Sequence, residues 1–260
     1  MVETHVSDAG KPAATDRLRA RSTADEIIRS FNTWAFKREQ PSDGKLLQRS
    51  IAEAVALRQP VTFVLYWGKG PRRFVSQPEI QCLDYLAALQ ERIKSTYAPG
   101  VKIILLLTDT HAQLNGYSQT DIDTYFSSVG AATEAYDYKC RRLSDVCLAG
   151  RHHTGLQVSS SPDPELLERL TRSASKWYRG GDAPEDAAIR YYAMNMVERQ
   201  AVAQCYPEAV FVTFNSSLFR ALFPRQLPIF YMYSIKKGVA EKPWFIPVDL
   251  ERATTAAAAE

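Results

Sequence analysis

Two apolar runs, Val61-Thr-Phe-Val-Leu-Tyr66 and Val101-Lys-Ile-Ile-Leu-Leu-Leu107, decide the fold together with the segment between them. Each run has the length of a strand, and the second is almost continuously aliphatic, as is typical of a parallel strand buried on both faces. Between them, Gln77–Ile93 repeats apolar residues with the period of a helix. Strand, helix and strand within 47 residues form a βαβ unit, which predicts a parallel sheet.

Further elements are expected on both sides of this unit. Helices are predicted before it over residues 23–38, where Thr23 and Glu26 have capping-box spacing, and over 45–57. After it we expect helices over 121–136, 164–178 and 184–204, and strands over 143–148, 209–214 and 229–234. The sequence therefore predicts an α/β, Rossmann-like fold with an open, mostly parallel sheet and helices on both faces.

The size and composition of the chain fit one such domain. The 260 residues are 45% hydrophobic and 23% charged, enough to bury a sizeable core. We expect a single catalytic domain over residues 22–252, between a disordered N-terminal tail (1–21) and a disordered C-terminal tail (253–260).

Charge and cysteine content restrict the possible partners and location. The formal net charge is only +3, which disfavours a protein that mainly neutralises nucleic-acid phosphates. We find no apolar run long enough to cross a membrane and no secretory signal, and the four cysteines form no C-x-x-C pair. A cytoplasmic protein without disulfides is expected.

A basic loop, Trp67-Gly-Lys-Gly-Pro-Arg-Arg73, follows the first strand. In open α/β sheets, ligands bind beyond the carboxyl ends of the strands, so this loop is a candidate site. Its cations, Lys69, Arg72 and Arg73, and its two glycines favour an anion site; the alternative is a basic surface turn. The segment is neither a dinucleotide fingerprint nor a P-loop.

The segment after the second strand, Thr108–Tyr117, is abruptly polar. Asp109 and His111 are candidates for general acid and base; the alternative is that Asp109 caps the next turn and His111 packs. Asn115 begins an Asn-Gly turn in either case. A metal would need more ligands, and the adjacent His152-His153 pair is more typical of a solvated loop, so no metal or cofactor is expected.

Other candidate pocket residues come later in the chain. Tyr191 and Glu198 are seven residues apart on a predicted helix, close to two turns, so both can face a pocket. Arg190 and Arg199 on the same helix are candidates to bind a carboxylate; the alternative is an exposed stripe of salt bridges. Asn215 follows a strand and either reaches the same crevice or belongs to a helix cap.

Several of these segments resemble the isocyanide (isonitrile) synthase family, which includes pyoverdine and dityrosine biosynthesis proteins. Tyr97–Asp109 and Leu114–Tyr125 are similar to that family's Tyr-Pro-Pro-Gly, strand, Ser-Asp-Gly and Val-x-Asp-x-x-Val-x-x-Tyr helix. The loop around Lys69 resembles its Phe-Pro-x-Lys-Ser-Pro-Asn, and Pro243-Trp244 resembles its Pro-Trp-His. Three positions depart from the pattern: Gly70-Pro71, His111 and Phe245.

The resemblance implies a metal-independent enzyme of secondary metabolism, a transferase or lyase. It would join the α-amine of an amino acid to the carbonyl of a pentulose phosphate, with no membrane or nucleic-acid partner. From their places in the sequence, the residues expected to catalyse this reaction are Lys69, Asp109 and His111. The residues expected to bind substrate are Trp67, Arg72, Arg73, Asn115, Tyr117, Arg190, Glu198, Arg199 and Asn215.

Two other functions remain open from the sequence. One is an aminoacyl transferase that uses aminoacyl-tRNA, because residues 191–233 are loosely similar to cyclodipeptide synthases. Their nucleophilic serine is replaced here by Trp67-Gly68-Lys69, and Met194 stands where their Tyr-x-x-x-Glu spacing needs tyrosine before Glu198. The other is a small-molecule-binding protein without catalysis.

Overall fold

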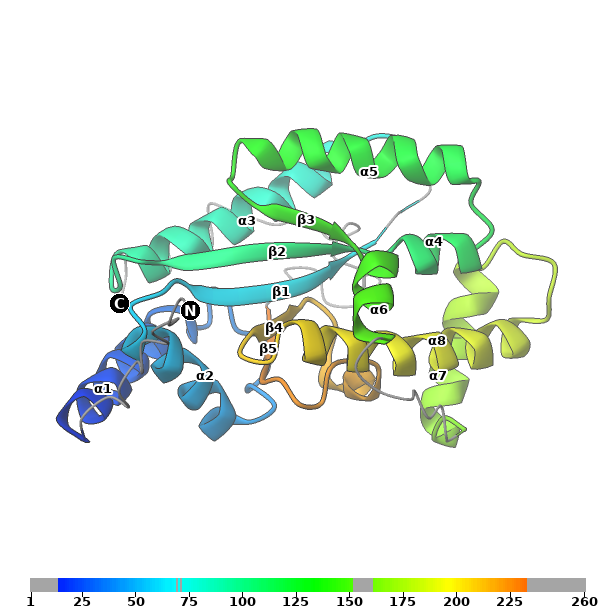
Figure 1. The fold of residues 1–260 in the computed structure, drawn as a ribbon. Coiled ribbons are helices and arrows are strands. Elements are labelled where there is room, and N and C mark those ends of the chain that lie inside the picture. The colour runs from blue at the N-terminus through cyan, green and yellow to red at the C-terminus, as the bar shows by residue number, and fades with distance from the viewer. Residues whose placement is uncertain (1–13, 69, 71, 152–160, 233–260) are drawn as a thin grey trace, which may run out of the picture.

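The computed structural model describes residues 14–68, 70, 72–151 and 161–232 (Figure 1). Five parallel strands form one sheet in the order β3-β2-β1-β4-β5. They are β1 (Val61–Trp67), β2 (Val101–Leu107), β3 (Lys139–Arg142), β4 (Val210–Thr213) and β5 (Ile229–Tyr231). The predicted Rossmann-like α/β fold is confirmed.

The strand order places a crevice at the centre of the sheet. From β1 the chain adds β2 and then β3 on one side, and later adds β4 and β5 on the other side of β1. At such a switch between β1 and β4, the loops leaving the two strands separate and open a space beyond their carboxyl ends.

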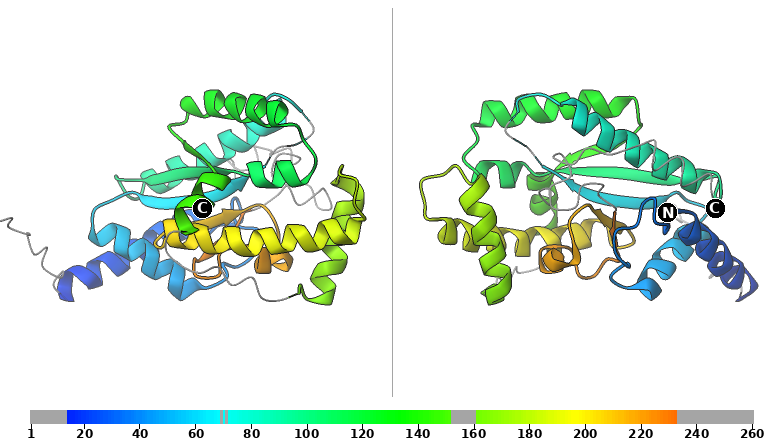
Figure 2. Two further views of the ribbon diagram at one scale, coloured as in Figure 1. Left: turned by 45° about the vertical axis from the view of Figure 1, so that its right-hand side comes forward. Right: turned by 180° about the vertical axis from the view of Figure 1, so that it is seen from behind.

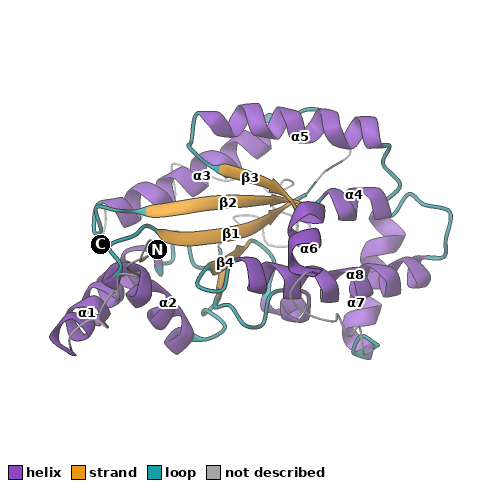
Figure 3. Cartoon of the chain, in the orientation of Figure 1, coloured by secondary structure: helices purple, strands orange, loops and turns teal. Residues whose placement is uncertain are grey.

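Helices cover both faces of the sheet (Figures 1 and 3). Buried residues of α1 (Ala14–Phe31), α2 (Gly44–Ala56), α3 (Gln77–Lys94) and α5 (Gln119–Glu134) pack on one face. Buried residues of α6 (Leu143–Arg151), α7 (Pro164–Trp177), α8 (Pro184–Cys205) and the 3₁₀ helix η1 (Ser217–Leu222) pack on the other. Figure 2 shows α3 and α5 on the side of the sheet opposite α6 and α8.

Strand alternation decides which side chains reach each layer. Successive residues of a strand point to opposite faces. Trp67 therefore lies fully buried in the layer with α3 and α5, whereas Tyr66 packs against the layer with α8. This corrects the prediction that Trp67 binds substrate.

The first helix differs from its prediction at both ends. It begins at Ala14 rather than Thr23, because residues 14–22 contain no glycine or proline and consist mainly of good helix formers. Part of the predicted tail is thus helical. The helix ends at Phe31 rather than Arg38, since Lys37 forms an antiparallel bridge with Met232. The rest of the predicted N-terminal tail and all of residues 253–260 lie outside the described residues.

The strand predicted over residues 143–148 is wrong. Those residues form α6, and the strand is the preceding Lys139–Arg142, a polar strand at the sheet edge. Leu143, Val146 and Cys147 are buried and have the spacing of one helix face. The apolar segment is too short for its periodicity to distinguish a helix from a strand.

The other predicted helices correspond to α2, α3, α5, α7 and α8, with shifts of a few residues at their ends. Besides α6, the helix α4 (Asp109–Leu114) was not expected; it begins directly after β2. Across the ranges that the structure describes, no helix is long and apolar enough to cross a membrane.

Candidate functional site

A cavity of about 470 Å³ lies where the carboxyl ends of β1, β2 and β4 meet α7 and α8. This volume is within the usual range of small-molecule sites. Tyr66 and Gly68 contribute to its wall from the end of β1, Thr108 and His111 from the end of β2, and Thr213 from the end of β4.

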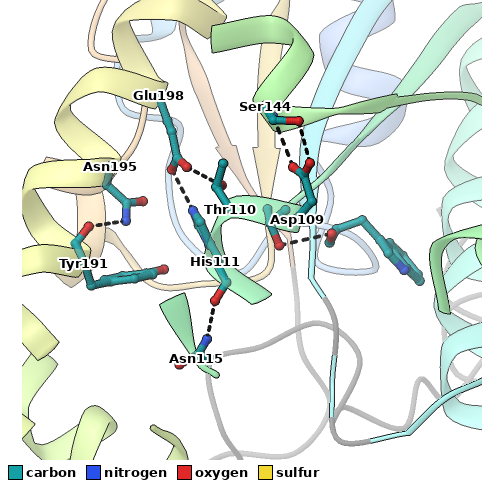
Figure 4. Close-up of polar contacts among 10 residues, drawn as sticks. Asp109, Thr110, His111, Asn115, Ser144, Tyr191, Asn195 and Glu198 are labelled. Atoms are coloured by element: carbon teal, nitrogen blue, oxygen red, sulfur yellow. Dashed lines mark hydrogen bonds and ion pairs between the residues drawn. The ribbon is translucent and has the colours of Figure 1, made fainter. Parts of the chain in front are cut away.

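His111 and Glu198 form the main polar pair at this cavity (Figure 4). His111 on α4 lines the cavity, and its Nε2 lies 2.6 Å from Oε2 of Glu198 on α8. The Glu198 side chain is 2% exposed and the His111 side chain 13%. The other oxygen of Glu198, Oε1, accepts a hydrogen bond of 2.5 Å from Thr110 Oγ1.

These contacts fix the roles of the two imidazole nitrogens. The Glu198 carboxylate accepts at both oxygens, so Nε2 of His111 donates to it. The described residues provide no hydrogen-bond partner for Nδ1. A carboxylate behind a histidine holds the ring in one tautomer, which leaves Nδ1 for proton exchange with a ligand.

Two tyrosines pack edge-on against the His111 ring. The centroid of Tyr191 lies 5.0 Å from it and that of Tyr66 5.9 Å, and both tyrosines line the cavity. Burial, and after it the charge of Glu198, raises the pKa of each tyrosine above its ordinary value, so both hydroxyls stay protonated. The Tyr66 hydroxyl is buried and has no hydrogen-bond partner among the described residues.

Asp109 does not share this pocket with His111. Its carboxylate accepts hydrogen bonds from the backbone N–H of Ser144, at 3.1 Å, and from its Oγ, at 2.5 Å. Ser144 is in the first turn of α6, where backbone N–H groups need a partner from outside the helix. Asp109 is absent from the described lining of the cavity, and Figure 4 shows it directed toward Ser144. Its predicted catalytic role is corrected to capping.

The basic loop after β1 does not supply the expected group of cations. Lys69 lies outside the described residues, and its predicted role stays a prediction. Arg73 is exposed and pairs with Asp121 at 2.6 Å. Arg72 is exposed as well, and neither arginine lines the cavity. The exposed part of this loop is a basic surface turn, the alternative that the sequence left open.

Three other predicted substrate contacts also lie elsewhere. Arg190 is exposed and pairs with Asp182. The Arg199 guanidinium donates to the carbonyl of Ala221, and burial lowers its pKa. Tyr117 packs against the core on the α3 and α5 side. None of these three side chains is among the described residues that line the cavity.

The two predicted asparagines do line it. Asn115 donates from Nδ2 to the carbonyl of His111 at 2.8 Å, which ties the end of α4 to its first turn. Asn215 follows β4 and stands at the opposite wall. His111 lines the cavity with them, whereas Glu198, which was also predicted to bind substrate, is absent from the described lining and instead contacts His111.

Sequence reasoning missed the cations that do face the cavity. They are Arg38, which donates to the carbonyl of Phe214 at 2.9 Å, and Arg169, Arg172 and Lys176 of α7. The helical spacing of the three α7 residues was a usable signal, because it places them on one face. Within the described ranges, no group of three or more histidine, cysteine, aspartate or glutamate side chains is arranged to hold a metal ion.

Comparisons with known proteins support the fold. The chain matches no protein-family model and no curated protein sequence. Among solved structures it is similar to the PvcA protein from Pseudomonas aeruginosa, with a TM-score of 0.66 and 17% identity over 86% of this chain and 87% of that one. A tyrosyl-tRNA synthetase from Archaeoglobus fulgidus, solved with L-tyrosine, gives a TM-score of 0.47 and 14% identity over 80% of this chain and 63% of that one. At these identities the PvcA match shows a shared α/β fold.

Proposed function

We propose that this chain is a biosynthetic enzyme of the isocyanide-synthase type, which joins the α-amine of an amino acid to the carbonyl of a sugar phosphate. The observation that carries the proposal is that His111 lines a cavity of small-molecule size and is bound at Nε2 by Glu198. The sequence resemblance to isocyanide synthases and the fold shared with PvcA support the same assignment.

His111 supplies the proton transfers that this condensation needs. The ammonium form of the amino acid gives one proton to Nδ1, and the freed amine forms a bond to the carbonyl carbon. One of the two protons left on the nitrogen then passes to the former carbonyl oxygen, and the imidazolium returns the first proton to the same oxygen, which leaves as water while a protonated imine forms. Glu198 holds Nε2–H, so the ring remains in position during both transfers.

The cavity wall fits two small polar substrates better than a large one. Its volume of about 470 Å³ accommodates an amino acid beside a five-carbon sugar phosphate. The rings of Tyr66 and Tyr191 provide apolar surface next to His111, and their protonated hydroxyls can donate to substrate oxygens.

The test is product formation by the purified full chain. The protein is incubated with the common amino acids and a pentulose phosphate, and mass spectrometry follows loss of both substrates and formation of an adduct. We expect His111→Asn and Glu198→Gln each to lower the rate by about 10²- to 10⁴-fold, as for the loss of general acid–base catalysis.

A lysine far from the cavity provides the matched control. Lys102→Ala changes an exposed residue of β2 and should leave the rate unchanged. The proposal is wrong if wild-type protein forms no adduct with any amino acid, or if His111→Asn forms it at the wild-type rate. Binding of aminoacyl-tRNA with a steep salt dependence would instead favour the transferase function.

A further inference from the structure

Thr110 and His111 are neighbours on α4 and share one partner on α8, the Glu198 carboxylate (Figure 4). Thr110 Oγ1 donates to Oε1 at 2.5 Å, and Nε2 of His111 lies 2.6 Å from Oε2. His111 lines the cavity, whereas Thr110 is absent from its described lining. An influence of the Thr110 hydroxyl on the site therefore passes through Glu198 and not through a contact with a ligand.

Burial makes the hydrogen bond from Thr110 important for Glu198. The Glu198 side chain is 2% exposed, and a buried carboxylate needs a donor at each oxygen. The last torsion of a glutamate side chain is broad, so packing alone leaves the plane of the carboxylate loosely defined. A donor at Oε1 fixes that plane, because it decides which oxygen remains for Nε2 of His111.

The Thr110 hydroxyl can reach Glu198 because of its place in the chain. A threonine inside a helix often donates to the backbone carbonyl three or four residues earlier. Thr110 is the second residue of α4, and the residues at those two positions, Leu107 and Leu106, belong to β2 and pair within the sheet. The hydroxyl donates to Glu198 instead of to its own helix.

The backbone of His111 is held separately from its ring. Asn115 donates to the His111 carbonyl from the backbone N–H at 3.0 Å and from Nδ2 at 2.8 Å. These contacts set the position of the residue but not the rotation of its imidazole ring, whose last torsion is also broad. The edge-on rings of Tyr66 and Tyr191 restrict the ring without distinguishing its nitrogens from its carbons. The hydrogen bond to Glu198 makes that distinction.

We propose that Thr110 is a positioning residue of this site, which acts through Glu198. Its hydroxyl holds the carboxylate so that Oε2 accepts from Nε2–H of His111, which keeps the neutral ring in one tautomer and leaves Nδ1 for a ligand. The orientation of the ring follows from these contacts alone, whereas its consequence for the rate rests on the proposed function.

Two-bond ¹H–¹⁵N spectra of the full chain labelled with ¹⁵N-histidine test the orientation without a substrate, and His111→Asn identifies the signal of His111. Thr110→Val keeps the shape of the side chain and removes the hydroxyl. We expect the ratio of the Nδ1–H to the Nε2–H tautomer of His111 to rise about tenfold, the lower end for loss of one hydrogen bond to a charged group. Thr110→Ser retains a hydroxyl and should keep the wild-type ratio.

A matched control separates this contact from a general effect of threonine replacement. Thr120→Val makes the same change at an exposed position in the first turn of α5, absent from the described cavity wall, and should leave the tautomer ratio unchanged. Thr110→Ala removes the hydroxyl in a smaller side chain, so that the result does not depend on how valine packs in α4. Circular dichroism establishes that each variant is folded.

Adduct formation measures the consequence for the rate. Thr110→Val should lower kcat about tenfold and change KM by less than about twofold, because the lost hydrogen bond orients His111 and Thr110 does not line the cavity. Thr110→Ser should keep kcat within about twofold of wild type, since it retains the donor.

The outcomes separate this inference from the proposed function. If the wild type forms no adduct, the proposed function fails, and the tautomer ratio still decides the role of Thr110. The inference is overturned if Thr110→Val and Thr110→Ala keep the wild-type ratio, or if Thr120→Val changes it equally. A Thr110→Ser protein that behaves as Thr110→Val does, or a rise in KM without a fall in kcat, also overturns it.

Discussion

Replacement of Asp109 by asparagine distinguishes a capping role from a catalytic one. The Asp109 carboxylate is 3% exposed and accepts two hydrogen bonds from Ser144. Asparagine keeps one oxygen, so one of the two donors at the start of α6 faces an amide NH₂ instead of an acceptor.

The size of the effect follows from these two contacts. A hydrogen bond to a charged group contributes about 1.5–3 kcal/mol, and loss of a helix cap costs about 0.5–2 kcal/mol. We therefore expect Asp109→Asn to lower the free energy of unfolding by about 2 kcal/mol. For a chain of this length, that corresponds to a fall in Tm of about 4–8 °C. Ser144→Ala removes only the hydroxyl donor and should cost about 1 kcal/mol.

Thermal unfolding followed by circular dichroism measures the stability, and adduct formation measures the activity. Below its Tm, Asp109→Asn should keep the turnover rate within about tenfold of wild type, since Asp109 does not line the cavity; a catalytic acid or base would contribute about 10²-fold or more. An unchanged Tm together with a lost activity would refute the capping role and restore the role that the sequence predicted.

Three further predictions concern stability. Tyr66→Phe removes a buried hydroxyl that has no partner among the described residues, so the free energy of unfolding in urea should stay the same or rise by about 1 kcal/mol, and a clear fall would show that the hydroxyl is bonded. Gly116→Ala should lower the free energy of unfolding by about 1–2 kcal/mol, because Gly116 has φ +83° and a new Cβ would lie 3.4 Å from the backbone of Arg179. Gly130→Ala is its control: Gly130 lies in α5 with open space around it, so this change should be neutral or stabilising. Burial, and then the hydrogen bond to Asp84, raises the pKa of Tyr136 from 10.0 to about 12, so the folded state binds this proton more tightly than the unfolded state does. The stability that the bound proton contributes is lost as pH rises from 10 to 12. The free energy of unfolding of Tyr136→Phe should therefore depend less on pH in that window.

The parallel sheet could be predicted from sequence because its two central strands are unambiguous. The run ending at Leu107 is too aliphatic to be anything but a strand buried on both faces, and the helix between the strands has clear periodicity. The edge strand Lys139–Arg142 could not, because a short polar strand with one neighbour carries no apolar signal. The strand was predicted instead in the following segment, Leu143–Leu148, because that segment is apolar.

The site was predictable in part for a similar reason. Placing polar residues after strands located His111. Helical spacing predicted that Glu198 faces the pocket, but Glu198 is absent from the described lining and contacts His111 instead. Only the fold shows that these two residues, 87 apart in sequence, meet. Asp109 was misassigned because its partner, Ser144, belongs to a helix that the sequence did not reveal. The α7 cations were missed because the search for site residues considered only the loops that follow strands. Helix α7 does not follow a strand directly, yet its residues line the cavity.

The tautomer of His111 tests the central pair most directly. The chain has four histidines, so ¹⁵N-histidine labelling gives few imidazole signals, and His111→Asn identifies the signal of His111. Two-bond ¹H–¹⁵N correlation spectra should show the proton of the neutral ring on Nε2, with Nδ1 unprotonated, and Glu198→Gln should alter this pattern. A neutral ring with its proton on Nδ1, or a pattern unaffected by Glu198→Gln, would contradict the pairing on which the proposed proton transfers depend.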